Sequence, residues 1–122
     1  MKADFEALIK AMKNNLAYSE WASSRTIEQQ FEELQKEINE LKKAIKNNDL
    51  NNLKEELGDV LWDLIFIITI CEQKGHFDIK EVMTSVLEKM KRRKPFIFEG
   101  KKTNLEEESD IWKKVKEKEK NG

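Results

Sequence analysis

The chain has 122 residues, with 23 Lys and Arg against 24 Asp and Glu, four Gly, one Pro, one Cys and one His. This length fits one small domain, and a hydrophobic content of 39% is too high for a disordered chain. The lone Cys71 and His76 exclude a disulfide framework and multi-histidine metal sites, and a net charge of -1 gives no bulk reason to bind nucleic acid or membranes. The scarcity of Gly and Pro favours helices.

Periodicity and capping residues predict five helical segments. The first carries apolar residues at helical spacing and ends near Tyr18, before a short connector that contains Trp21. Thr26 and Gln29 form a capping-box sequence, which predicts the start of the second helix. Its apolar residues alternate steps of four and three and form one seam: Ile27, Phe31, Leu34, Ile38, Leu41 and Ile45.

The third helix is the most apolar part of the chain. Residues 47–49 break the second helix, and Asn52 with Glu55 is predicted to cap a third helix that runs to about Lys74. Gly75 supplies the C-terminal stop. Because this helix is apolar on nearly all sides, one neighbouring layer cannot cover it.

Polar pairs mark the starts of the last two helices: Asp78 with Glu81, and Asn104 with Glu107. The fourth helix must end near Lys94, because Pro95 follows. Residues 96–100 are predicted to form a loop, and the fifth helix leads into a Lys/Glu tail.

These elements predict an all-α fold, a bundle of about five helices around a central antiparallel hairpin of the second and third helices. We expect one domain over residues 1–122, in which residues 99–122 form a C-terminal lid and tail. About 120 residues bury only around two-thirds of their unfolded surface, so we expect oligomerisation to complete the bundle. A homodimer and a homotetramer both remain open.

Localisation is expected to be cytoplasmic. The N-terminus lacks an apolar stretch followed by a small-residue cleavage site. The longest apolar stretch, residues 60–71, is interrupted by Asp63 and is much shorter than the roughly 20 residues that a bilayer span needs.

Two acidic rows carry the chemical information. Each follows one face of its helix: Glu33, Glu37 and Glu40 on the second helix, and Glu56, Asp59 and Asp63 on the third. The antiparallel hairpin lets the rows face each other. Neither row includes a lysine, although Glu–Lys pairs would stabilise a helix by roughly 0.2–0.5 kcal/mol each. We therefore expect a cation between the rows; the alternative is a set of solvated acids in a charged chain.

With oxygen ligands only, Mg²⁺ or Mn²⁺ fits this pattern better than Zn²⁺. Because Mg²⁺ keeps positions for water and phosphate, the expected substrate is a phosphate ester or anhydride. Gly58, inside the third helix between two of these acids, indicates close approach of a ligand or close helix packing, and both interpretations stay open.

A basic cluster closes the fourth helix. Lys89 and Arg93 lie one turn apart, so both can reach one polyphosphate. The alternative is a solvated cluster that the helix dipole favours.

The acidic motifs resemble a known family. Residues 36–41 read Lys-Glu-Ile-Asn-Glu-Leu and residues 55–62 read Glu-Glu-Leu-Gly-Asp-Val-Leu-Trp. This pattern is similar to the MazG-type nucleoside triphosphate pyrophosphohydrolases, relatives of the all-α dimeric dUTPases. The resemblance extends from Trp21 to Lys116, most of the chain. Lys36 replaces the first Glu of the family's acidic pair.

The resemblance implies roles for eight residues. The catalytic Mg²⁺ (or Mn²⁺) ligands would be Glu37, Glu40, Glu56 and Asp59, and the nucleotide-binding residues would be Lys89, Arg93, Trp112 and Lys116. Glu33 and Asp63, one turn away from these ligands, would be outer-shell groups or water-positioning bases, and the alternative for both is ordinary salt bridging. The implied activity is hydrolysis of a nucleoside triphosphate between its α and β phosphates, giving the monophosphate and pyrophosphate. The alternative is a non-catalytic helical oligomerisation or interaction module.

Overall fold

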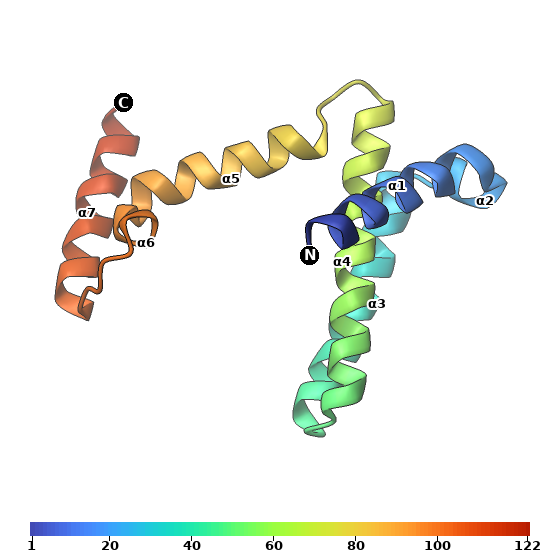
Figure 1. Ribbon diagram of the computed structural model, residues 1–122, viewed down its shortest axis with the longest axis horizontal. Coiled ribbons are helices and arrows are strands. Elements are labelled where there is room, and N and C mark those ends of the chain that lie inside the picture. The colour runs from blue at the N-terminus through green and yellow to red at the C-terminus, as the bar shows by residue number, and fades with distance from the viewer. The chain divides into compact units, whose positions relative to one another are not determined.

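A computed structural model describes all 122 residues and contains helices only (Figure 1). In chain order the helices are α1 (Lys2–Tyr18), α2 (Glu20–Ser23), α3 (Ile27–Lys46), α4 (Leu50–Gln73), α5 (Ile79–Arg93), α6 (Pro95–Glu99) and α7 (Leu105–Asn121). The predicted all-α class is confirmed. The five predicted helices correspond to α1, α3, α4, α5 and α7, and the chain forms two compact units, Met1–Ile79 and Lys80–Gly122.

The first unit is built on the antiparallel hairpin of α3 and α4, which lie side by side in Figure 1. The predicted capping box opens α3: the Thr26 hydroxyl accepts from the Gln29 amide, and the Gln29 side chain accepts from the Thr26 amide. The predicted cap of α4 is wrong. Asp49 caps it by accepting from the Asn52 amide at 3.2 Å, because the connector turns through Asn48 at a positive φ of 54°.

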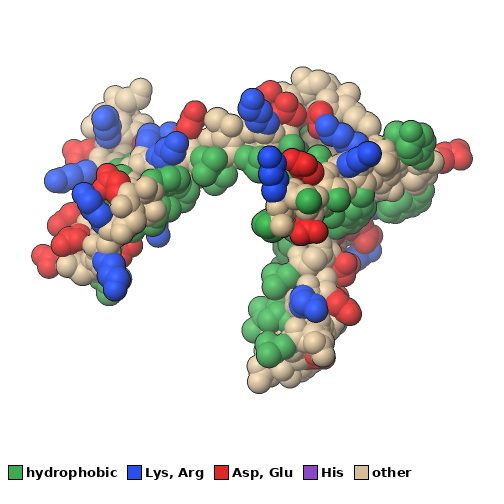
Figure 2. Space-filling model, viewed as in Figure 1, with side chains coloured by type: hydrophobic (Ala, Val, Ile, Leu, Met, Phe, Trp, Pro, Cys, Tyr) green, Lys and Arg blue, Asp and Glu red, His purple; other side chains and the backbone are tan.

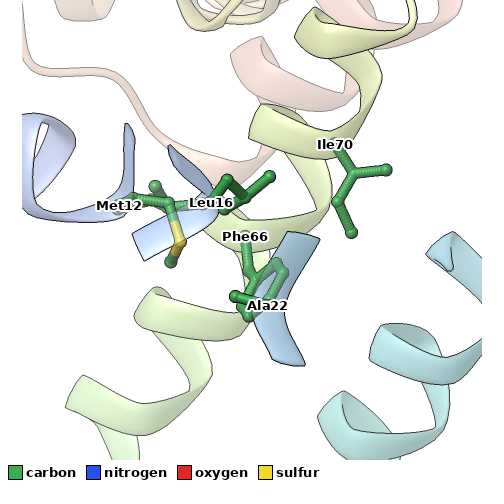
Figure 3. Packing of buried hydrophobic residues seen from close by; sticks show 6 residues of the cluster. Met12, Leu16, Ala22, Phe66 and Ile70 are labelled. Carbon is green, nitrogen blue, oxygen red and sulfur yellow. The ribbon is translucent and has the colours of Figure 1, made fainter. Parts of the chain in front are cut away.

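The core of this unit lies where α1 and α2 pack on the C-terminal half of α4. Its buried side chains are Met12, Leu16, Ala22, Ile65, Phe66 and Ile70 (Figure 3). Trp21, in the predicted connector, stands edge-on to Phe66 with ring centroids 6.3 Å apart. Full burial of a Leu, Ile, Phe or Met side chain contributes about 1.5–3 kcal/mol. The cluster of buried side chains therefore holds α1 and α2 against the hairpin.

The second unit comprises most of α5 with α6 and α7. Pro95 ends α5 as predicted but also starts the short helix α6, so the predicted loop over residues 96–100 is wrong. Gly100 ends α6 in the left-handed conformation, with φ 66°. Asn104 caps α7 as predicted, accepting from the Glu107 amide at 2.9 Å. None of these three helices has a buried side chain.

An apolar face remains uncovered along the hairpin. Its residues are 44–72% exposed and repeat at heptad spacing: Phe31, Ile38 and Ile45 on α3, and Leu50, Leu57, Leu61 and Leu64 on α4. Figure 2 shows hydrophobic side chains along one edge of the hairpin. Most of these residues come directly after a residue that faces the other helix. In two antiparallel helices, the residues that come one position after the contact residues lie on the same side of the pair. The two rows therefore form one face, which we call the hairpin face.

No helix combines the length and the apolar character that a membrane crossing requires. The interruption of α4 by Asp59 and Asp63 is one reason. The expected single domain over residues 1–122 stays a prediction.

Candidate functional site

The hairpin brings three of the predicted acids together. Carboxylate oxygens of Glu37, Glu56 and Asp59 all lie within 4.8 Å of one another. The tight turn capped by Asp49 sets this register, because it places Glu37 of α3 opposite Glu56 of α4. The prediction that the two acidic rows can face each other is therefore confirmed at these three positions.

The three carboxyl groups lack a positive partner. A hydrogen bond with Glu56 raises the pKa of Glu37 from its ordinary value of 4.5 to about 7. Burial and the charges of Glu56, Asp59 and Asp63 act in the same direction. The Glu56 Oε2 atom is buried without a hydrogen-bond partner. A site in which one carboxyl keeps a proton and another has an unpartnered oxygen suits a hard divalent cation.

Glu40 and Glu33 lie outside this cluster. Glu40 pairs with Lys43 at 3.2 Å, and Glu33 pairs with Lys36 at 3.3 Å. All four side chains are substantially exposed, and such surface pairs contribute only about 0–1 kcal/mol. The ordinary salt bridge that was the alternative role of Glu33 thus exists, and Glu40 forms one as well. Its predicted role as a ligand stays a prediction.

Asp63 differs from the other acids because it is buried. It is only 8% exposed, and its Oδ2 atom has no hydrogen-bond partner. Burial, followed by the negative charges of Glu33 and Asp59, raises the pKa of Asp63 above its usual range. No ion pair of the chain involves this carboxyl.

Three of the four predicted nucleotide-binding residues gather in the second unit. The Arg93 guanidinium lies 5.1 Å from the centre of the Trp112 ring, and the Lys116 ammonium lies 4.6 Å from it. Lys89 lies one turn before Arg93 on α5. The sequence interpretation missed Glu119, whose carboxylate accepts from Arg93 Nε at 3.3 Å and from Nη2 at 3.0 Å. Glu119 comes seven residues after Trp112 and therefore lies on the same face of α7. This spacing could have predicted that Glu119 lies near Trp112.

Gly58 has open space beside it. A Cβ atom built there would meet nothing within 4 Å, so close packing inside this chain does not explain the glycine. Of the two interpretations, close approach of a ligand or of another molecule remains.

The acidic cluster predicts a pH-dependent stability of the metal-free protein. Raised pKa values mean that Glu37 and Asp63 bind protons more strongly in the folded chain than in the unfolded chain. Stability should therefore fall as pH rises from about 4.5 through about 7. We expect a loss of ~1–2 kcal/mol after allowance for solvent screening.

Scanning calorimetry in chelator between pH 5 and 8 measures this loss. The double variant Glu37→Gln, Asp63→Asn should flatten the profile. A thermal midpoint that rises steadily with pH in the unmodified protein would contradict the prediction.

Comparisons with known proteins identify the family of the chain. Residues 25–98 match the model of the MazG nucleotide pyrophosphohydrolase domain. The chain is 35% identical over 104 residues to a Bacillus subtilis protein called uncharacterized protein YabN, covering 83% of this chain and 21% of that protein. It is 35% identical over 96 residues to the nucleoside triphosphate pyrophosphohydrolase/pyrophosphatase MazG of Thermotoga maritima, covering 77% of this chain and 38% of that protein.

A solved structure is similar over nearly its whole length. The crystal structure of a mazG-related protein from Thermotoga maritima superposes with a TM-score of 0.87 and 35% sequence identity, covering 92% of this chain and 98% of that one. The chain spans only about a fifth to two-fifths of the two curated relatives. The family match, which covers the acidic hairpin, and the shared fold establish that the chain belongs to the MazG nucleotide pyrophosphohydrolase domain family.

Proposed function

We propose that this chain hydrolyses nucleoside triphosphates, ribo- or deoxyribo-, between the α and β phosphates to give a nucleoside monophosphate and pyrophosphate. The observation that carries the proposal is the convergence of Glu37, Glu56 and Asp59 on the hairpin of a MazG domain. Relatives named nucleoside triphosphate pyrophosphohydrolase support it.

Glu37, Glu56 and Asp59 would hold Mg²⁺, or Mn²⁺ in its place. The buried, unpartnered Glu56 oxygen and the raised pKa of Glu37 support this assignment, as does the absence of nitrogen or sulfur donors among the three. When bound, such a cation neutralises charge on phosphate oxygens and lowers the pKa of the attacking water. Glu40 would join the three as a ligand by leaving Lys43.

The remaining residues bind and position the substrate. Lys89 and Arg93 would bind phosphate oxygens from one face of α5, because they are one turn apart. Trp112 would stack on the nucleotide, and Lys116 would add a further positive charge. A carboxylate of the acidic cluster would accept the proton of the attacking water.

The test is a panel of canonical and modified nucleoside triphosphates with Mg²⁺, assayed separately for pyrophosphate and orthophosphate. We expect pyrophosphate with no orthophosphate, and loss of product in chelator. Orthophosphate as the first product would overturn the proposed position of cleavage, and no turnover of any nucleotide would overturn the activity.

The hairpin face favours one alternative, a non-catalytic helical module that mediates assembly. Only an enzyme needs the acidic rows and a divalent cation, so the nucleotide panel separates the two functions. The hairpin face is compatible with both functions, because an enzyme can also form an oligomer through it.

We propose that a second copy of this chain covers the hairpin face, in a homodimer or a homotetramer. The heptad spacing of the face is the pattern by which two helices pack against each other. Burying the exposed half of each Leu or Ile there would contribute about 1 kcal/mol.

Sedimentation at micromolar concentration should show at least two chains per particle. The double variant Ile38→Lys, Leu57→Lys should shift the particle towards a monomer, because each lysine replaces an exposed apolar side chain in the middle of the face. Tyr18→Lys, which changes an exposed side chain outside the face, is the control. A stable, compact monomer of the unmodified protein would contradict the proposal.

A further inference from the structure

Glu119 of α7 binds the guanidinium that the proposed reaction assigns to the substrate's phosphate groups. Its carboxylate accepts from Arg93 Nε at 3.3 Å and from Arg93 Nη2 at 3.0 Å. This is the two-pronged geometry with which a guanidinium also binds phosphate. The side chains of Arg93 and Glu119 are only 16% and 26% exposed. Two donors of this planar group are therefore engaged within the chain.

The surroundings of Glu119 are those of an anion-binding position. The hydrogen bond from Arg93 lowers the pKa of Glu119 below its usual range. The positive charges of Arg93, Arg92 and Lys116 act in the same direction. Arg93 and Lys116 also both lie over the ring of Trp112, at 5.1 Å and 4.6 Å from its centre. One carboxylate thus lies among three cations, beside the aromatic ring that is proposed to stack on the nucleotide.

The carboxylate of Glu119 has space to leave Arg93. Glu119 lines a cavity of about 380 Å³ in the second unit, together with Arg92, Val115, Lys118 and Gly122. Because the cavity borders this side chain, rotation of Glu119 frees Arg93 without a movement of α7. A single carboxylate is also a weaker partner for a guanidinium than a polyphosphate, which carries several negative charges.

We propose that Glu119 is a built-in competitor of the substrate, whose carboxylate occupies the phosphate position on Arg93 until a polyphosphate displaces it. The inference rests on the proposed function, because that function assigns Arg93 to phosphate. The exchange makes and breaks no covalent bond, since one anion replaces another on the same two N–H donors. Its consequence is a lower affinity for every anion that binds Arg93, the reaction products included, because each must first displace the carboxylate.

Nuclear magnetic resonance of the Arg93 Nε–H group tests the inference apart from activity. The probe is inorganic tripolyphosphate, titrated into the full chain in chelator so that no divalent cation takes part. The Nε–H signal of Arg93 is identified by its loss in Arg93→Lys, and its shift reports the replacement of Glu119. We expect Glu119→Gln to bind tripolyphosphate about fivefold more tightly, because an ion pair of this kind no longer competes.

Glu117→Gln is the matched control, because it removes the same charge from α7. Glu117 is exposed, and Arg93 pairs with Glu119 instead. The control should change the affinity by less than about twofold at physiological salt, where exposed charges are screened. In calorimetric titrations, Glu119→Gln combined with Arg93→Gln should bind within about twofold of Arg93→Gln alone, because the competitor acts through Arg93.

The outcomes separate this inference from the proposed function. Equal affinity of the unmodified chain and Glu119→Gln, with the Arg93 signal shifted in both, would overturn the competitor and leave the phosphate role of Arg93 intact. An Arg93 signal that tripolyphosphate never shifts would overturn both. Tighter binding by Glu119→Gln without turnover of any nucleotide would retain the competitor and overturn the enzyme. If Glu119→Gln loses helical circular dichroism, Glu119→Asp decides, because its shorter side chain draws the charge back from Arg93 and should also tighten binding.

Discussion

Glu56→Gln and Asp59→Asn should each lower turnover of a nucleoside triphosphate by a factor of roughly 10²–10³ or more. Each amide removes one negative charge from a cluster that holds its oxygens within 4.8 Å of one another. Charge stabilisation by a bound cation is worth several kcal/mol in the transition state, and each ~1.4 kcal/mol lost is a factor of ten. Pyrophosphate release under saturating Mg²⁺ measures the effect.

The same substitutions should leave the fold intact. The amides have the size of the acids and relieve repulsion in the metal-free protein, so helical circular dichroism should persist and the thermal midpoint should not fall. Glu55→Gln is the matched control, because it removes an exposed charge outside the cluster and should retain turnover. Full activity in both Glu56→Gln and Asp59→Asn would remove the central claim of the proposed mechanism.

The hairpin and its acid cluster could be predicted from the sequence because both depend on local rules. Helical periodicity fixes which residues share a face, and a short polar connector makes α3 and α4 antiparallel neighbours. Glu37 and Glu56 then meet because the connector is too short to allow another register. The capping box at Thr26 and the cap at Asn104 likewise depend on contacts within four residues.

Other features could not be predicted because they depend on competing contacts. Asp49 and Asn52 are both good capping residues, and the positive φ of Asn48 decides in favour of Asp49. Pro95 ends one helix but is also well suited to the first turn of the next, which produced α6. Asp63 is buried although it is an acid, and the pattern of α4 alone does not show this because burial depends on which helices pack around it.

Deletion of residues 104–122 should raise the Michaelis constant for the nucleotide and leave the apo thermal midpoint nearly unchanged. The deletion removes Trp112 and Lys116, and stacking of a base on an aromatic ring is worth about 1–3 kcal/mol. We therefore expect an increase of roughly 5- to 150-fold. Stability should persist because α7 has no buried side chain. If the deletion unfolds the protein, Trp112 is a core residue and the lid interpretation fails.

Arg93 has two competing roles that substitution can separate. It would bind phosphate as a planar, bidentate donor, and Arg93→Lys should then lower kcat/KM more than Lys91→Ala, which changes a cation lying over Phe98. In the structure the same guanidinium holds Glu119 of α7. If Arg93 serves only to hold α7, Glu119→Gln should reproduce the defect of Arg93→Lys. If Arg93 binds phosphate, Glu119→Gln should leave KM unchanged or lower it, because it frees the donor that the triphosphate needs.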